Sequence, residues 1–342
     1  AKKFGETYKE IIKNKIKINE KIVFKKIPDN ENGISKIFGK CLTETTKILK
    51  KTKPDLLIVV GDRYEILASV ISANLLKTPV AHIHGGELTF GAMDDAFRHS
   101  ITKMSHIHFT ANKVYKKRVI QLGENPKNVH VVGGLGVDSL IKTDFLTRDE
   151  LEKKYSFSFK KRNFLVCFHP ETSSDISSKK QITEILSALE ELKDSLIIFT
   201  MPGADLGNSI IKKEIKKFIR VNKNTLFIES FGQVDFFSLL KQVNAIIGNS
   251  SSGILEMPYF QKATINLGDR QLGRLNSRSV LNSPIKKNDI LKSVKKIFLP
   301  SFNKKIKKNE KFYGKGGASK KIVKILKNLD TKNLFQKKFF NI

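Results

Sequence analysis

The stretch LLIVVGDRYEILASVISANLLKTPVAHIH, residues 56–84, decides the fold of this chain. A short apolar run at 56–60 is followed by a helix-like segment and then by a second apolar run at 79–84. The same alternation continues through HIHFT (106–110), a helix over 112–121 and NVHVV (128–132). Short apolar strands separated by helices are typical of a parallel sheet covered on both faces, so we expect a Rossmann-like domain here.

A second series of strands and helices begins near Arg162. The apolar runs NFLVCFHP, SLIIFT, TLFIES, NAIIG and ATINLG alternate with helix-like segments at 178–192, 207–221 and VDFFSLLKQ, and further helices are expected near 288–298 and 318–329. We therefore predict an α/β fold with two Rossmann-like domains facing a cleft. The glycines of VGGLGVDSL (132–140) relax the backbone and favour a hinge between the two domains.

The predicted domains are 1–140, 141–317 and 318–342, the last being a helix and tail that pack back on the first domain. A doubly wound domain normally opens with a strand and a tight phosphate-facing loop, whereas this chain opens on a helix-like segment. We therefore expect the N-terminal strand and phosphate loop to be missing, a stretch of roughly 30 residues by the size of a β-α-β unit.

Composition excludes several classes of protein. The chain has 342 residues, of which 40% are hydrophobic, enough for packed cores and too many for wholesale disorder. No apolar run approaches the roughly 20 residues that a transmembrane helix needs, and no signal peptide is visible. Two cysteines far apart in sequence, Cys41 and Cys167, form no disulfide framework. These features indicate a cytoplasmic protein with no membrane partner.

The net charge is unusually positive, at +30 from 63 Lys and Arg against 33 Asp and Glu. Such a charge raises the question of nucleic-acid binding. Only nine of the basic residues are arginine, however, and base readout and phosphate recognition depend on arginine. We therefore expect a solvated basic surface whose field attracts an anionic nucleotide, and no nucleic-acid partner.

Charged groups follow the first strand directly, in VVGDRYE (59–65). Asp62 and Arg63 lie just past the carboxyl end of the strand, where open α/β sheets place their ligands. Asp62 and Glu65 could simply cap the next helix. Arg63 between them favours a binding site, because a guanidinium grips phosphate or carboxylate with two hydrogen bonds.

Titratable groups are concentrated in AHIHGGELTFGAMDDAFRHS (81–100). His82 and His84 are two apart on a predicted strand and are expected to share a face. Gly85 and Gly86 leave room for a ligand, and three carboxylates follow, those of Glu87, Asp94 and Asp95. An Asp at the helix start could be only an N-cap. Five such groups in fourteen residues instead indicate acid/base chemistry.

The second half carries features of an anion site. In IIGNSSSGILEMP (246–258) a strand runs into glycine, three serines and a short helix, whose first backbone N–H groups can bind phosphate. An ordinary serine N-cap is the alternative. Glu256 could accept hydrogen bonds from ribose hydroxyls. Three of the nine arginines fall in INLGDRQLGRLNSR (265–278), and His169 ends a strand of the same half.

Taken together, these blocks resemble one family. GDRYE, AHIHGGE, GAMDDAFRHSITKMSH, YKKRVIQLGENP, VGGLGVDSL, FHPET, GNSSSGILEMP and INLGDRQLGR occur in this order and cover nearly the whole chain. They look like the hydrolysing UDP-N-acetylglucosamine 2-epimerases of sialic and legionaminic acid biosynthesis. The resemblance implies the glycosyltransferase-B-like fold, with two Rossmann-like domains.

The resemblance also implies a reaction and a set of roles. UDP leaves C1 as the C2 proton is removed, and water then adds to the glycal with inversion at C2, through a transition state like that of glycoside hydrolysis. The residues expected around the sugar are Asp62, His84, Glu87, Asp94 and Asp95. Those expected to hold UDP are Arg63, His169, Ser250, Ser251, Glu256 and Arg270. Asp62 and Asp95 are the leading candidates for the base at C2.

The sequence departs from the family pattern in three places. The N-terminus should carry the family's first strand and an arginine loop, Phe90 stands where an acid is frequent, and Gly203 stands where an asparagine is usual. The expected substrate is UDP-N-acetylglucosamine, with UDP-diacetylbacillosamine left open. No metal or other cofactor is expected. The expected partners are the UDP-sugar and further copies of the chain in a dimer or tetramer.

Two other functions compete with this one. Pairs of histidines at 82/84 and 106/108, with Asp94 and Asp95, could ligate zinc or manganese in a metal-dependent hydrolase. The chain could also be a non-catalytic module that binds a UDP-sugar without turnover. Metal analysis tests the first alternative, and a product assay set against a binding assay tests the second.

Overall fold

The computed structural model describes residues 8–24, 30–171, 174–201, 207–331 and 333–342. Gly203 lies outside the described residues. The chain divides into two compact units, each taken here with only its described residues. The four-stranded unit comprises Lys17–Thr89, Met93–Asp138 and Phe312–Ile342, and the six-stranded unit comprises Ala1–Ile16, Phe90–Ala92 and Ser139–Lys311.

The four-stranded unit is built on a parallel sheet of the order β1-β2-β3-β4. Its strands are β1 (Leu57–Val60), β2 (Val80–Ile83), β3 (Ile107–Thr110) and β4 (Val129–Val131). Its helices are α2 (Glu31–Thr52), α3 (Tyr64–Leu75), α4 (Asp94–Met104), α5 (Lys113–Gln121), the 3-10 turn η2 (Pro126–Asn128) and α14 (Ala318–Lys327). Each predicted strand of this half is therefore present, within one or two residues.

Helices cover both faces of this sheet because successive strand residues point to opposite sides. On β2, Val80 packs in the cluster that contains residues of α3 and α4. Ala81 and Ile83, on the other face, pack against α14. Two residues of β1 remain partly exposed to solvent, Ile58 at 46% and Val60 at 49%.

The six-stranded unit is a second parallel sheet, of the order β10-β9-β8-β5-β6-β7. Its strands are β5 (Arg162–Cys167), β6 (Ser195–Thr200), β7 (Thr225–Ile228), β8 (Ala245–Gly248), β9 (Ala263–Leu267) and β10 (Val280–Ser283). Its helices are α1 (Tyr8–Lys13), α7 (Arg148–Tyr155), α8 (Ser178–Glu190), α9 (Asn208–Val221), α10 (Gly232–Gln242), α11 (Ser252–Leu255), the 3-10 turn η3 (Met257–Phe260), α12 (Lys287–Ile297) and α13 (Pro300–Ile306).

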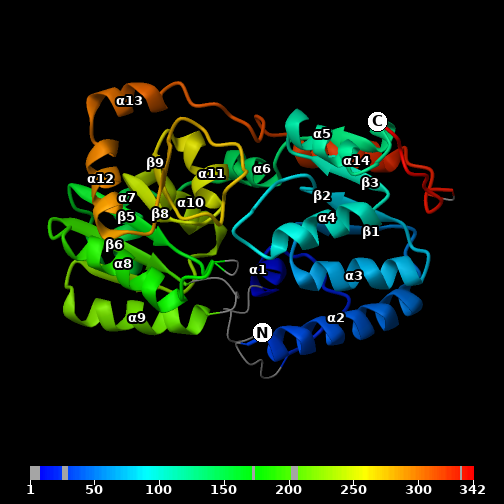
Figure 1. Cartoon of the computed structure of the whole chain (residues 1–342), viewed down its shortest axis with the longest axis horizontal. Coiled ribbons are helices and arrows are strands. Elements are labelled where there is room, and N and C mark those ends of the chain that lie inside the picture. Colours follow the sequence, from blue (N-terminus) through cyan, green and yellow to red (C-terminus); the bar gives the residue numbers. More distant parts are fainter. Residues whose placement is uncertain (1–7, 25–29, 172–173, 202–206, 332) are drawn as a thin grey trace. The chain divides into compact units, whose positions relative to one another are not determined.

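This sheet is also doubly wound (Figure 1). Val166 of β5 packs in the core shared with α8, α9 and α12, whereas its neighbour Leu165 packs in the core shared with α7 and α10. Strand order reverses at β5, because β6 follows it on one side and β8 lies on the other. Open α/β sheets bind ligands beyond the carboxyl ends of the strands at such a reversal. The prediction of an α/β fold with two Rossmann-like sheets is confirmed.

Some elements differ from the sequence prediction. The glycine-rich stretch 132–140 is largely helical, since α6 runs over Leu135–Lys142. Gly133, with φ of +101°, and Gly134, whose N–H donates to the Tyr313 carbonyl at 2.8 Å, precede that helix, and the hinge stays a prediction. The helices α2, α7 and α13 and the short strand β10 were not predicted. Among the described residues no helix is long and apolar enough to cross a membrane.

The last ten residues dock on the four-stranded unit. The Phe339 ring lies against Gly123, where an added Cβ would come 2.3 Å from the ring, and Phe340 N–H donates to the Gly123 carbonyl at 2.9 Å. Lys337 Nζ pairs with the Glu124 carboxylate at 2.9 Å. His108 of β3 bonds the same carboxylate at 3.0 Å. The tail is therefore tied to the sheet through a buried carboxylate.

Glu124→Gln should lower the free energy of unfolding by about 3 kcal/mol at pH 7, the order found when a buried charge pair is broken. Burial alone would raise the pKa of Glu124, but hydrogen bonds from His108 and Lys337 outweigh it and lower the pKa to about 2. This stabilisation is present above about pH 4.5 and is lost as the pH falls toward 2. Denaturant unfolding of both proteins between pH 7 and 3 measures the difference.

The matched control is Glu44→Gln, which removes a carboxylate from an exposed pair with Lys47. Exposed pairs are screened by solvent, so this variant should unfold like the wild type. If the difference in unfolding free energy between Glu124→Gln and the wild type stayed constant down to pH 3, this would contradict the assigned dependence of stability on the Glu124 pKa.

Candidate functional site

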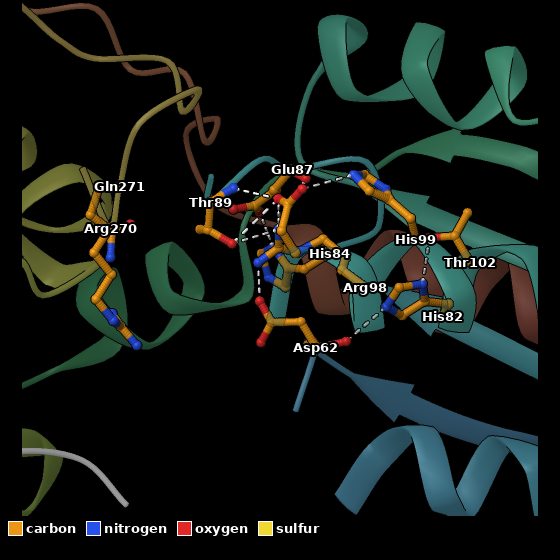
Figure 2. A network of polar contacts seen from close by, with 12 residues as sticks. Asp62, His82, His84, Glu87, Thr89, Arg98, His99, Thr102, Arg270 and Gln271 are labelled. Atoms are coloured by element: carbon orange, nitrogen blue, oxygen red, sulfur yellow. Dashed lines mark hydrogen bonds and ion pairs between the residues drawn. The ribbon is translucent and has the colours of Figure 1, made fainter. Parts of the chain in front are cut away.

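Arg98 on α4 is the centre of a polar network beyond β1 and β2 (Figure 2). Its Nη2 donates to the Asp62 carboxylate, and its Nη1 donates to Asp95 Oδ1 at 3.2 Å. The same Nη1 donates to the Glu87 carbonyl and to Thr89 Oγ1, both at 3.1 Å. The Arg98 side chain is 1% exposed. One buried cation thus joins two carboxylates that come from different elements.

Helix geometry places Asp95 in this network. Asp95 lies in the first turn of α4, so Arg98 and His99 follow it at the spacings that share a helix face. His99 Nε2 lies 3.5 Å from Asp95 Oδ2, and burial lowers the pKa of His99. Thr89 N–H donates to Asp95 Oδ1 at 2.5 Å. The carboxylate is therefore held from both sides.

His84 is held in an uncommon backbone conformation just after β2. Its φ is +70°, in the left-handed region that a non-glycine residue adopts only when the surroundings hold it there. Its Nδ1 donates to Glu87 Oε1 at 2.9 Å, while Nε2 accepts from Leu135 N–H at 3.4 Å. The two hydrogen bonds fix the orientation of the ring.

The titratable groups differ in their access to solvent. The side chains of Asp62, Asp95 and His84 are 25%, 20% and 17% exposed. Glu87 is 3% exposed, and its Oε2 accepts from Tyr313 Oη at 3.5 Å. Two carboxylates and one imidazole therefore reach the surface, where they could exchange protons with a ligand, while Glu87 lies behind His84.

His82 has a different environment from His84, contrary to the expectation that both share one strand face. The strand ends at Ile83, so the alternation of side chains does not extend to His84. His82 is fully buried, with Nε2 2.9 Å from the Gly61 carbonyl and Nδ1 3.1 Å from Thr102 Oγ1. Burial lowers the pKa of His82 to about 3, so this ring stays neutral and ties β2 to its neighbours.

Two other predicted residues of this unit lie beside the network. Asp94 is the first residue of α4 and is half-buried. Arg63 forms a two-pronged ion pair with Glu65, through Nε at 3.1 Å and Nη2 at 3.3 Å. Arg63 belongs to the four-stranded unit, whereas the other five residues predicted to hold UDP belong to the six-stranded unit.

In the six-stranded unit, predicted site residues follow the two strands at the reversal of strand order. His169 follows β5, and Ser250 and Ser251 follow β8. Gly248, with φ of +141°, lets β8 approach β5 closely, since an added Cβ would lie 2.1 Å from the Cys167 carbonyl oxygen. The adjacent ends of two parallel strands thus bring these residues together.

The serine-rich loop leads into only a single helical turn. α11 is four residues long, so its dipole is small, and it continues into η3 after Glu256. Ser250 Oγ accepts from Ser252 N–H at 3.3 Å, and the Ser251 carbonyl accepts from Leu255 N–H at 2.8 Å. Serine hydroxyls and loop N–H groups, rather than a long helix, are the donors available to an anion here.

Arg270 lies on the loop after β9. Its Nη1 donates to the Asn249 carbonyl at 3.3 Å. Glu171 Oε1 accepts from the backbone N–H groups of Asp269 and Arg270, at 2.6 and 2.9 Å. Burial raises the pKa of Glu171, opposed by these two hydrogen bonds. The loop that carries Arg270 is therefore fixed by a carboxylate from the loop after β5.

The positions of the histidines bear on the alternative of a metal-dependent hydrolase. His106 Nδ1 accepts from Val80 N–H at 3.1 Å, and His108 Nε2 lies 3.0 Å from Glu124. Both nitrogens of His82 also face protein groups. Within the described ranges, no three His, Cys, Asp or Glu side chains are gathered as metal ligands would be. His82, His106 and His108 therefore serve the packing of the strands.

A protein-family model described as UDP-N-acetylglucosamine 2-epimerase matches residues 1–327 of the chain. The chain belongs to the UDP-N-acetylglucosamine 2-epimerase family. A Campylobacter jejuni protein named GDP/UDP-N,N'-diacetylbacillosamine 2-epimerase (hydrolyzing) is 36% identical over 99% of this chain and 88% of that protein. The polysialic acid biosynthesis protein P7 of Escherichia coli is 40% identical over 88% of this chain and 77% of that protein.

Solved structures of UDP-N-acetylglucosamine 2-epimerases share the fold. That of the Neisseria meningitidis enzyme, bound to UDP-GlcNAc, superposes with a TM-score of 0.80 over 93% of this chain and 88% of that one, at 22% identity. The predicted membership of the hydrolysing UDP-N-acetylglucosamine 2-epimerase family is confirmed, as is the glycosyltransferase-B-like fold.

Sequence reasoning about this epimerase-family chain missed two central residues. Arg98 stands three residues after Asp95 on a predicted helix, in a chain with only nine arginines, and that combination could have singled it out. Asn249 is fully buried and hydrogen-bonded to the loop after β5. No spacing rule marks a buried asparagine within GNSSSG, because its side chain bonds to His169, which lies 80 residues away on the loop after β5.

Proposed function

We propose that this chain is a hydrolysing 2-epimerase that converts UDP-N-acetylglucosamine into UDP and a free N-acetylmannosamine-type sugar. Family membership supports the reaction class. The observation that carries the proposal is the network around Arg98, which presents Asp62, Asp95 and His84 at the surface of one unit. Such a group of carboxylates and an imidazole suits a reaction that removes and returns a proton at carbon.

The proposed reaction has two steps. A base takes the C2 proton while the bond from C1 to the diphosphate oxygen breaks, and the bonding electrons leave with UDP to give a 2-acetamidoglycal. Water then adds across the double bond, with the hydroxyl joining C1 and a proton joining C2 from the opposite face. The overall change consumes one water and yields UDP and the C2-inverted sugar.

In this proposal Asp62 and Asp95 are the catalytic candidates, because both are carboxylates with solvent access. Arg98 is a positioning residue, since its buried guanidinium orients both carboxylates at once. His84 is the third group with access to a ligand. Glu87 acts through His84 by holding the Nδ1 side of its ring. Asp94 is retained as a sugar contact.

The UDP moiety is assigned mainly to the six-stranded unit. Its predicted contacts are His169, Ser250, Ser251, Glu256 and Arg270, with Arg63 added from the four-stranded unit. Hydroxyl and guanidinium donors suit a diphosphate, and the position at the reversal of strand order suits a nucleotide. The proposal includes no metal ion and no dinucleotide.

The test is a product assay on the purified chain. Incubation with UDP-N-acetylglucosamine should release UDP and a free sugar epimeric at C2 in equal amounts, and EDTA should leave the rate unchanged. UDP-diacetylbacillosamine is the second substrate to test, because it appears in the name of the C. jejuni relative. A higher kcat/KM for that sugar would reassign the substrate. Binding of UDP-sugar without any product would favour the non-catalytic module.

Arg270→Ala should weaken UDP binding by about 1.5–3 kcal/mol, the cost typical of losing hydrogen bonds to a charged group. Calorimetric titration with UDP measures this directly. The matched control is Arg278→Ala, which removes an exposed guanidinium paired with Glu310 from the same segment and should leave the affinity unchanged. Unchanged UDP affinity in a folded Arg270→Ala protein would place Arg270 outside the site.

A further inference from the structure

Three loops of the six-stranded unit each carry a residue assigned to UDP. His169 lies on the loop after β5, Ser250 on the loop after β8 and Arg270 on the loop after β9. The three strands are neighbours in the sheet, in the order β9-β8-β5. The central loop, after β8, is bonded to both of the others through Asn249.

The Asn249 side chain clamps the peptide groups of His169. Its Oδ1 accepts from His169 N–H at 2.7 Å, and its Nδ2 donates to the His169 carbonyl at 2.8 Å. Asn249 is 0% exposed, so both bonds are shielded from water. A primary amide is the side chain that can donate and accept at once in this geometry.

The Asn249 backbone holds the third loop. Its carbonyl oxygen accepts from Gln271 Nε2 at 2.8 Å and from Arg270 Nη1 at 3.3 Å. Gln271 is 1% exposed, and its side chain bridges the loops from the interior. Four hydrogen bonds to one residue therefore connect the loops that carry His169 and Arg270.

We propose that Asn249 is a positioning residue that orders these three loops into one preformed cradle for the diphosphate. This inference rests on the proposed function. Asn249 touches no reacting atom, so its effect is on binding: loops that are ordered before the ligand arrives lose less conformational entropy on binding. When binding is weakened equally in the ground state and in the transition state, KM rises and kcat stays nearly unchanged.

The chain supplies a matched control in β5, the strand that leads to His169. Asn163, in β5, clamps Lys160 with the same pair of bonds, accepting from its N–H and donating to its carbonyl, both at 2.8 Å. Asn163 is 4% exposed and lies at the opposite end of β5 from His169. Asn163→Ala removes an equivalent buried clamp, yet should leave the loops after β5, β8 and β9 intact.

The experiment compares UDP affinity, steady-state kinetics and amide hydrogen exchange for Asn249→Ala, Asn163→Ala and the wild type. Asn249→Ala should weaken UDP binding about 10- to 100-fold, as expected for the loss of two buried hydrogen bonds that hold the site. KM should rise in step while kcat stays within about threefold. Without ligand, exchange should accelerate in segment 167–171, where the His169 peptide groups lose the amide clamp. Segment 268–272 keeps its bonds to the Asn249 carbonyl and to Glu171 and should change less. Asn163→Ala should show none of these changes, whatever its effect on thermal stability.

Gln271→Met is a second variant, measured alongside Asn249→Ala. It replaces Asn249→Ala if that protein fails to fold. It removes the Nε2 donor with little change in length and should weaken UDP binding in the same direction by a smaller factor. Equal losses of affinity in Asn249→Ala and Asn163→Ala, or unchanged exchange at 167–171, would overturn the inference. A wild type that does not bind UDP would overturn the proposed function itself.

Discussion

Replacing Asp62 or Asp95 with asparagine should lower turnover about 10²- to 10⁴-fold, the contribution typical of a positioned acid or base. The amide keeps the shape of the side chain and removes its charge. Affinity for UDP should stay within a few-fold, because neither carboxylate is assigned to the nucleotide. Steady-state kinetics and calorimetric titration with UDP separate the two quantities.

Solvent deuterium sharpens this test. The wild-type product should carry deuterium at C2, because the second step takes its proton from a group that exchanges with solvent. The matched control is Asp194→Asn, an exposed acid of the six-stranded unit, which should retain wild-type turnover. If both variants of the network keep near-normal turnover, or lose UDP binding in proportion to activity, these carboxylates do not perform the chemistry.

Arg98→Met should destabilise the four-stranded unit by about 3–5 kcal/mol, the cost of removing one partner from a buried charge network. The change leaves Asp62 and Asp95 without their shared cation and deprives Thr89 Oγ1 and the Glu87 carbonyl of a donor. Total stabilities of proteins are of the order of 5–15 kcal/mol, so the loss should be plain in denaturant unfolding. Turnover should fall as well.

Arg98→Lys separates charge from geometry. A lysine restores the positive charge but cannot donate to four acceptors in one plane, so part of the stability should return while turnover remains low. Arg220→Met, an exposed change on α9, is the control and should alter stability by less than about 0.5 kcal/mol. A stable Arg98→Met protein with full activity would remove Arg98 from its assigned role.

The fold was largely predictable because hydrophobic periodicity is local. Runs such as 56–60 and 195–200 show which residues are buried without reference to the rest of the chain. The strand β10 was not predicted because its four residues, VLNS, show no hydrophobic periodicity. It forms by pairing in register with β9. The helix α6 was not predicted because two glycines precede it and a third, Gly136, lies inside it, followed by residues of low helix propensity, so the stretch suggested a hinge.

The site was predictable only in part, for a related reason. Groups beside strand ends, such as Asp62 and His84, can be read from their position after an apolar run. Their partners cannot, because the bond from Arg98 to Asp62 spans 36 residues and the bond from Asn249 to His169 spans 80. The conformation of His84 was equally hidden, since a histidine gives no sequence signal for a positive φ.

The four-stranded unit is built from separate stretches of the chain, and this affects when it can fold during synthesis. Its core includes Ala318 and Ile322 of α14, and Glu124 is paired with Lys337, so the unit cannot be complete until those residues have been made. The stretch 139–311, which forms most of the six-stranded unit, is synthesised in between. At 5–20 residues per second this takes about 10–35 s, during which the earlier strands lack one of their covering helices. The four-stranded unit is therefore completed only after residues 139–311 of the six-stranded unit have been made.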